Sequence, residues 1–386
     1  MKDSPTLVND IPKAADQPVV SGYSLDEVQK KYPPPDLRSL DKFGKGVTRE
    51  QAELLQTSRQ AFIMNFAHGK TQVARGLQLA DTLAEGLARR TGGLLWDEET
   101  REIFTPDQWR RKRIQSWSDG TPDVSEHTTI HAYKSDDYVR AITLGMAKFG
   151  LPDVVAENFG WSLNRPMGNL INLFCQSLVE GAVIAHPGRF ELDIRKIRHR
   201  EVRDPQINSL KPNATAIARL SLGEAAPENG DPRNRLIAIG FDRYPGTDMP
   251  SKQEILLSSL FGWEDDVTPV DRKNAELRAA SRDAKAQLPK LRKAFVDGLA
   301  PGEFIQVKAP FRIPDGGQEW MWVEITGWNG DNIKGPLKNE PFNIQSLHRG
   351  QIVEVKQDDV FDFIRQFSDG RQEGNETGAV IEKMRQ

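Results

Sequence analysis

The sequence predicts an α+β fold, with a sandwich-like N-terminal α/β module of β-α-β units and a small C-terminal β-rich, barrel-like domain. Two observations lead to this prediction. Between residues 48 and 265, apolar runs of strand length alternate with amphipathic segments of helical period. From about residue 301 onward, short strand-like runs follow one another with Gly and Pro turns between them. At 386 residues, the chain is long enough for two or three domains.

The first elements are a polar tail and one β-α-β unit. Residues 1–47 contain many polar residues and prolines, and we expect a disordered or extended tail. The apolar run AFIMNF at 61–66 predicts a strand, and the stripe from Val73 to Leu87 predicts a helix that ends before Gly92. Residues 94–96 (LLW) predict the second strand.

A second unit of the same layout is expected to follow. Residues 128–133 and 154–159 read as strands. Between them, Ser135 is a good N-cap for a helix whose buried stripe would be Val139, Ile142, Met146 and Phe149. The remaining predicted elements are an apolar helix over 167–178, strands at 190–194, 214–222 and 235–241, a linking helix over 266–300, and the β-rich domain over 301–386.

Composition excludes several classes of protein. The net charge is −3, and neither the part before Glu303 nor the part after it has a large excess of one sign, which disfavours nucleic acid as a partner. The single cysteine, Cys175, rules out an intrachain disulfide and a multi-thiolate zinc site, and we expect it to be buried in a helix. No apolar run is long enough for a membrane span, and no signal peptide is visible. We expect a cytoplasmic protein, or an exported periplasmic lipoprotein if the numbering starts after a removed signal.

The usual catalytic patterns are not assembled. HGKT at 68–71 lacks the first glycine of a phosphate-binding loop, and G-x-S-x-G is absent. The histidines are scattered and give no ligand set, so we predict no metal and no cofactor. The sequence therefore favours a non-catalytic protein that binds another protein.

Two basic clusters are candidate anion-binding sites. They consist of Arg110, Arg111, Lys112 and Arg113 between two tryptophans, and of Arg195, Lys196, Arg198 and Arg200. Interleaved basic and aromatic residues can bind phosphates and stack on bases. Solvated basic faces are the alternative, and a shared positive face would be needed for nucleic-acid binding.

The C-terminal block holds the other candidate residues. In EWMWVEI (319–325), strand alternation places Trp320, Trp322 and Glu324 on one face. That face is either packed in a core or open as a platform for sugars or a peptide. The candidate binding residues are Lys308, Glu319, Trp320, Trp322, Glu324 and Asn339. As an alternative, a hydrolase-like enzyme would use Glu319 as general base, with Lys308 or Asn339 orienting the substrate.

These C-terminal motifs resemble a known family. FIQVKAPF, EWMWVEI, IKGPLKNEP, LHRGQIVEV and the GRQEGNET ending are similar to the YegJ-like bacterial domain of unknown function, number 2314 in its series. The resemblance implies a fold and a bacterial origin, and it transfers no activity. If the protein is a non-catalytic binding protein, an immunity or envelope-associated accessory role is one expectation. The sequence departs from the family at Trp320, where the family has histidine, and at Gln351, where it has aspartate. The matching residues are Val307, Lys308, Phe311, Glu319, Met321, Trp322, Val323, Gly335, Leu337, Asn339, Pro341, Gly350 and Val353.

Overall fold

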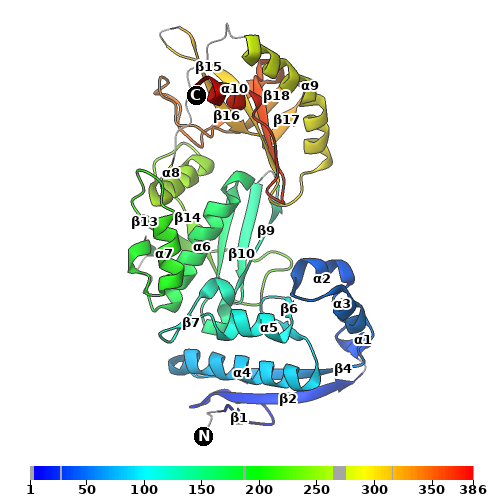
Figure 1. Cartoon of the computed structure of the whole chain (residues 1–386). Helices are drawn as coiled ribbons and strands as arrows, with labels where there is room; N and C mark the ends of the chain where they lie inside the picture. Colours follow the sequence, from blue (N-terminus) through cyan, green and yellow to red (C-terminus); the bar gives the residue numbers. More distant parts are fainter. Residues whose placement is uncertain are drawn as a thin grey trace.

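The chain forms three tiers that follow one another in sequence order: an N-terminal group of small sheets and helices, a central six-stranded sheet, and a C-terminal β-rich part (Figure 1). A computed structural model describes residues 4–26, 28–136, 138–185, 188–263, 275–314 and 316–385. The fold is a mixture of helices and several sheets, which confirms the α+β class in outline.

The N-terminal tier begins with a sheet where a disordered or extended tail was expected. Strand β2 pairs antiparallel with β4 over eight residues, and β1 adds to it in parallel. The physical reason is that Val19 and Val20 are buried, so the segment has an apolar anchor despite its polar surroundings. The elements of this region are β1 (Thr6–Leu7), β2 (Val19–Asp26), α1 (Val28–Lys31), α2 (Leu37–Phe43), β3 (Gly44–Lys45), α3 (Arg49–Gln56) and β4 (Gln60–Ala67).

The predicted helix of the first β-α-β unit is confirmed as α4 (Val73–Thr91). It ends at Gly92, whose φ of 70° suits a residue without a side chain. The strands on either side do not share a sheet, because β4 pairs with β2 whereas β5 pairs with β6. The elements that follow α4 are β5 (Leu95–Asp97), β6 (Glu102–Phe104), α5 (Pro106–Trp109), the π-helical turn η2 (Arg110–Ile114), β7 (Trp117–Ser118) and β8 (Thr121–Pro122).

The central sheet has the strand order β12-β13-β14-β11-β10-β9. Every neighbouring pair is antiparallel except β11 with β14, which run parallel. Its strands are β9 (Thr129–Ser135), β10 (Tyr138–Leu144), β11 (Asp153–Phe159), β12 (Arg189–Asp193), β13 (Ile217–Glu224) and β14 (Leu236–Gly240). The strands predicted at 128–133, 154–159, 190–194, 214–222 and 235–241 are thereby confirmed, with shifted ends.

The helix predicted after Ser135 is wrong. Residues 138–144 form β10, which folds back on β9 with Tyr138 opposite Ser135, and Asp136 has a φ of 52° in the connection. The run VRAITL is buried on both faces and contains β-branched residues, so a central strand fits it better than a surface helix. The helical spacing of Val139 and Ile142 was a coincidence of this continuous apolar run.

Three helices accompany the central sheet: α6 (Asn164–Val179), α7 (Arg200–Asn208) and α8 (Met249–Phe261). Helices α6 and α8 contact β11 and each other, and their apolar side chains join those of the strands in the largest core. Cys175 lies fully buried in α6, as expected. Burial raises the pKa of its thiol well above the ordinary value, so it is an inert part of the core.

The C-terminal part consists of two small sheets with two helices. One sheet has the order β16-β15-β20-β21 and the other β17-β18-β19. Within the described ranges, these strands do not close into a barrel, so the barrel-like expectation is wrong. The elements are α9 (Ala275–Asp297), β15 (Phe304–Arg312), β16 (Gln318–Glu324), β17 (Gly327–Asn329), β18 (Asn332–Pro336), β19 (Ile352–Lys356), β20 (Asp362–Gln366), β21 (Gln372–Gly374) and α10 (Glu376–Arg385).

The predicted linking helix corresponds to α9, and the part expected before Ala275 lies outside the described residues. Its side chains Ala284, Leu288 and Leu291 are buried in the same core as the C-terminal strands, so α9 packs with them. The predicted domain limits at 47, 265 and 300 stay predictions. None of the helices that the structure describes is long and apolar enough to cross a membrane.

Candidate functional site

The C-terminal part contains an open cavity of about 430 Å³, which we call the Trp320 groove. It lies between the first half of α9, the ends of β15 and β16 that Pro310 and Gln318 mark, and the 3-10 turn Gln357–Asp359 with the two residues after it. The described residues that line it are Leu277, Arg278, Lys285, Pro310, Gln318, Trp320, Asp358, Asp359, Val360 and Phe361.

Two aromatic rings form the centre of the groove. The register of β15 with β16 places Trp320 opposite Pro310, while its neighbour Met321 points into the core. The Trp320 ring packs against that of Phe361, with centroids 4.6 Å apart and planes tilted by 45°. The backbone N–H of Phe361 donates to the carbonyl of Lys308 at 2.7 Å, which ties this aromatic residue to β15. The predicted alternation of the tryptophan strand is confirmed, and one of its tryptophans lines a cavity.

The charged rim has both signs. Arg278 and Lys285 come from α9, whereas Asp358 and Asp359 come from the 3-10 turn and are exposed. Lys285 Nζ donates to the carbonyl oxygen of Asp358 at 2.7 Å, so the two walls are joined at one point. A groove with an aromatic floor and mixed charges at its edge can hold an apolar side chain flanked by charged groups.

Trp322 and Lys308 lie together outside the groove. Lys308 Nζ stands 5.4 Å from the centre of the Trp322 ring, within cation–π range. Lys308 is also buried, and its charge helps to lower the pKa of Asp362, which burial raises above its ordinary value. Lys308 therefore contacts Trp322 and Asp362 inside the domain and does not line the Trp320 groove.

Glu319 and Asn339 both hold the loop that follows β18. The two carboxylate oxygens of Glu319 accept hydrogen bonds from the backbone N–H groups of Phe342 and Asn343, at 2.7 and 3.0 Å. Asn339 Oδ1 accepts from the backbone N–H of Trp322 at 2.7 Å. Neither residue lines the Trp320 groove. Glu319, the predicted general base, therefore stabilises a loop. Lys308, Glu319 and Asn339, the three residues of the hydrolase alternative, do not line a common cavity among those described.

Glu324 faces the central tier. Its Oε1 accepts from the backbone N–H of Ser162 at 3.1 Å, and its Oε2 accepts from the Ser162 hydroxyl. A Cβ atom on Gly160 would lie 2.7 Å from Glu324 Oε2, so the carboxylate fits here only because residue 160 has no side chain. Lys338 forms an ion pair with Glu254 of α8 nearby. Glu324 thus joins the C-terminal part to the rest of the chain.

The first basic cluster is neutralised by its neighbours. Arg113 is almost fully buried against Phe104, and Arg110 makes two hydrogen bonds to one carboxylate. The pairings are Arg110 with Glu85, Arg111 with Gln108, Lys112 with Glu126, and Arg113 with Asp97. Three of the four charges are therefore compensated, and this segment presents little free positive surface.

The second cluster is compensated in the same way. Arg195 and Lys196 pair with Asp193, and Arg198 pairs with Glu180, while Arg200 is exposed at the start of α7. The chain segments that carry the two basic clusters are in contact at His199, whose Nε2 lies 3.2 Å from the carbonyl oxygen of Ser116. Three of the four exposed charges are thus paired with acids, and the geometry gives no support to the nucleic-acid alternative.

A buried charged network was not foreseen. Asp81 on α4, Asp97 on β5, Arg113 on η2 and Lys148 on the turn after β10 meet where the N-terminal tier packs on the central sheet. Lys148 Nζ lies 2.7 Å from Asp97 Oδ2. Burial acts to raise the pKa of Asp97, but Lys148 and Arg113 outweigh it and hold that pKa below its ordinary value. The four residues come from separate elements, so no sequence pattern marks them.

Asp81 behaves differently from Asp97. Burial raises its pKa to about 7, and its Oδ2 has no hydrogen-bond partner among the described residues. Burial also lowers the pKa of Lys148. Perturbed groups of this kind occur at functional sites and equally in structural ion-pair networks. No group of three or more potential metal ligands is present in the described part of the chain.

Comparison with known proteins identifies only the C-terminal part. No curated protein and no solved structure matches the chain. The family model described as "Uncharacterized protein conserved in bacteria (DUF2314)" matches residues 274–386, which span α9, all strands of the two C-terminal sheets and α10. The resemblance drawn from the C-terminal motifs is confirmed: residues 274–386 are a DUF2314 domain.

Proposed function

We propose that this protein is a non-catalytic binding protein whose DUF2314 domain holds a peptide segment of a partner protein in the Trp320 groove. The observation that supports this is the half-buried pair of Trp320 and Phe361 in a cavity of about 430 Å³. Ligand sites generally have volumes of roughly 300–1,000 Å³ and apolar linings with a few polar groups. Tryptophan is also the residue type that most often dominates the affinity of protein interfaces.

The charges favour a peptide over a polyanion. A nucleic acid or an anionic membrane needs one continuous basic surface, whereas the rim combines Arg278 and Lys285 with Asp358 and Asp359. A peptide with one apolar anchor side chain and charged neighbours satisfies both signs. The groove also offers no nucleophile with an adjacent base, because its described lining lacks serine, cysteine and histidine. An immunity or envelope-associated role, and the cytoplasmic or periplasmic location, stay predictions.

Peptide display tests this proposal without knowledge of the partner. A library of random peptides of about twelve residues, the length of typical recognition motifs, is selected on the wild-type chain. The enriched peptides are then tested on Trp320→Ala and on Phe342→Ala. Phe342 is the matched control, because it is an exposed aromatic residue of the same domain that does not line the groove.

We expect enriched peptides that share an aromatic or aliphatic anchor and that lose at least about tenfold in affinity on Trp320→Ala but not on Phe342→Ala. Selection that yields no binders, or binders indifferent to Trp320→Ala, would contradict the proposal. Circular dichroism of the two variants checks that both keep the wild-type fold.

A further inference from the structure

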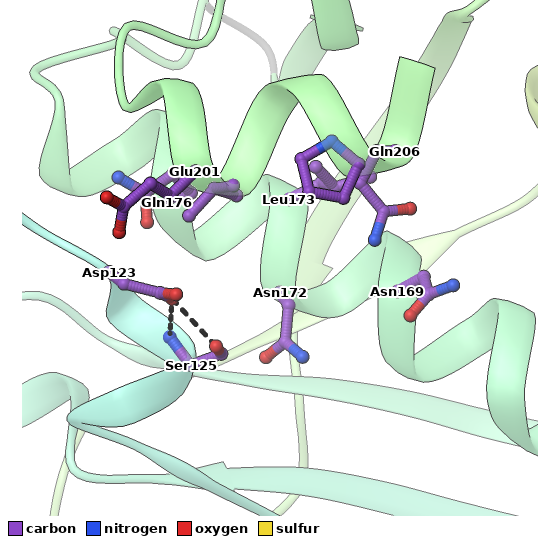
Figure 2. A pocket seen from close by; sticks show the side chains of 10 residues that line it. Asp123, Ser125, Asn169, Asn172, Leu173, Gln176, Glu201 and Gln206 are labelled. Atoms are coloured by element: carbon purple, nitrogen blue, oxygen red, sulfur yellow. Dashed lines mark hydrogen bonds between the residues drawn. The ribbon is translucent and has the colours of Figure 1, made fainter. Parts of the chain in front are cut away.

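A second cavity lies in the central tier, away from the DUF2314 domain. It has a volume of about 180 Å³, is partly open to solvent, and is lined by α6, α7 and the 3-10 turn Val124–Glu126 with the residue before it (Figure 2). We call it the α6–α7 cavity. The described residues that line it are Asp123, Ser125, Asn169, Asn172, Leu173, Gln176, Glu201, Val202, Pro205 and Gln206.

Helix α6 presents a polar stripe to this cavity. Most of the helix is apolar and buried in the largest core, yet Asn169, Asn172 and Gln176 recur at helical spacing on one side. Gln176 is fixed in place, because its Oε1 accepts from the backbone N–H of Val124 at 2.9 Å and its Nε2 donates to the carbonyl of Pro122 at 3.0 Å. The wall that carries the other two carboxamides is therefore rigid.

Two carboxylates stand on one side of the cavity. Figure 2 shows Asp123 and Glu201 toward the same side, with Asp123 Oδ1 accepting from Ser125 N and Oγ at 2.9 and 2.7 Å. No ion pair of either carboxylate occurs among the described residues, and none of the described lining residues is lysine, arginine or histidine. The cavity therefore favours a cation and disfavours phosphate or carboxylate ligands.

The opposite side carries carboxamides. Figure 2 places Asn169 and Gln206 away from the two acids, with Asn172 between them. Gln206 Oε1 is shielded from solvent and has no hydrogen-bond partner within the described ranges. A buried acceptor without a donor is destabilising, and a donor from a ligand would offset this cost. Leu173, Val202 and Pro205 add an apolar wall suited to CH groups.

We propose that the α6–α7 cavity binds a small hydroxylated primary amine of the amino-sugar type. Its ammonium group would pair with Asp123 and Glu201, and its hydroxyl groups would donate to and accept from Asn169, Asn172 and Gln206. The cavity is smaller than the roughly 300 Å³ at which drug-sized sites begin, so the ligand is a small metabolite. This site is independent of the Trp320 groove and of any peptide bound there.

Isothermal titration calorimetry of the full chain with matched probes tests the proposal. Glucosamine carries the ammonium group and the hydroxyls, glucose lacks the charge, and putrescine carries ammonium groups without hydroxyls. The titrations are made near pH 6.5, where the amine is charged. The informative variants are Glu201→Gln and Gln206→Met, which change charge or hydrogen bonding at nearly constant size. Asp204→Asn is the matched control, because this exposed carboxylate lies on α7 but does not line the cavity.

We expect glucosamine to bind with at least about tenfold higher affinity than glucose or putrescine, to weaken about tenfold on Glu201→Gln and on Gln206→Met, and to be unaffected by Asp204→Asn. Absence of glucosamine binding at about 10 mM overturns the proposal. So does equal binding of glucose, or binding that Asp204→Asn weakens as much as Glu201→Gln.

Discussion

The Glu324 carboxylate accepts a hydrogen bond from the backbone N–H of Ser162 at 3.1 Å, across the junction between the DUF2314 domain and the central tier. The residue is buried, and a second bond from the Ser162 hydroxyl completes its contacts to that loop. A charged group buried at a junction stabilises it only while its partners are present. The relation between these two residues therefore predicts that the domain and the rest of the chain unfold as a coupled unit.

Replacement of Glu324 by alanine tests this coupling. Loss of a buried carboxylate with two donors leaves the N–H and hydroxyl of Ser162 unpaired, which we expect to cost about 2–3 kcal/mol of unfolding free energy. Urea denaturation followed by tryptophan fluorescence measures the loss. The control is Glu354→Ala, an exposed carboxylate of the same domain, which should change stability by less than about 0.5 kcal/mol. Equal effects of the two variants would contradict the account.

A double-mutant cycle with Gly160 resolves the contact itself. Gly160 has a φ of −74°, which alanine adopts without strain, so Gly160→Ala acts through its Cβ, placed 2.7 Å from Glu324 Oε2. We expect Gly160→Ala to destabilise the wild type by about 1–3 kcal/mol and to have little effect in the Glu324→Ala background. Additive effects in the cycle would show that the clash is not with this carboxylate.

The glycine of the family motif at position 335 is predicted to be structural. A Cβ atom there would lie 1.6 Å from the carbonyl oxygen of Glu324, a distance that only backbone movement can relieve. We expect Gly335→Ala to cost at least about 3 kcal/mol or to prevent folding of the domain, as read from its thermal unfolding. Gly327→Ala is the matched control, because its Cβ would meet nothing closer than 3.8 Å. Its thermal unfolding should remain close to that of the wild type.

Asp81 makes stability depend on pH in a defined direction. Burial raises its pKa in the folded chain to about 7, above the ordinary value of 3.8, so the unfolded chain releases this proton first as the pH rises. The group therefore lowers stability progressively between about pH 4 and 7. We expect Asp81→Asn to match the wild type near pH 4 and to exceed it by about 4 kcal/mol at pH 8 in urea denaturation. The exposed Asp119→Asn should leave the pH profile unchanged; a parallel shift at both pH values for Asp81→Asn would contradict the assignment.

The two faces of β16 should differ in their effect on stability. Met321 is fully buried in the C-terminal core, whereas Trp320 is partly exposed in the groove. We expect Met321→Ala to cost about 2–5 kcal/mol and Trp320→Ala clearly less, because only the former leaves an enclosed void. Thermal unfolding of both variants decides between a groove residue and a core residue. A larger loss for Trp320→Ala would mean that this side chain serves packing.

Strand alternation and helical period predicted those elements whose patterns are local. The face of β16 that carries Trp320, the apolar helix α6 and the stripe of α4 all follow from residues close in sequence. The helix prediction for residues 138–144 failed because a run of consecutive apolar residues fits both the helical and the strand period. Pairing with β9 and β11 makes this segment a strand.

The sites depend on contacts that the sequence does not display. Phe361 contacts Trp320 although they are 41 positions apart in the sequence, because β15 pairs with β16 on one side and with β20 on the other. Glu319 and Asn339 belong to the family motifs, yet their partners are backbone N–H groups, of a loop for Glu319 and of β16 for Asn339, which a pattern of side chains does not show. The residues of the α6–α7 cavity likewise come from three separate segments.

The measurement that tests the central proposal most directly is the affinity of one display-selected peptide for three forms of the full chain. Isothermal titration compares the wild type, Trp320→Ala and Phe342→Ala under the same conditions. The account predicts a loss of at least about tenfold for Trp320→Ala and wild-type affinity for Phe342→Ala. Equal affinity of all three forms would contradict the assignment of the Trp320 groove as the binding site.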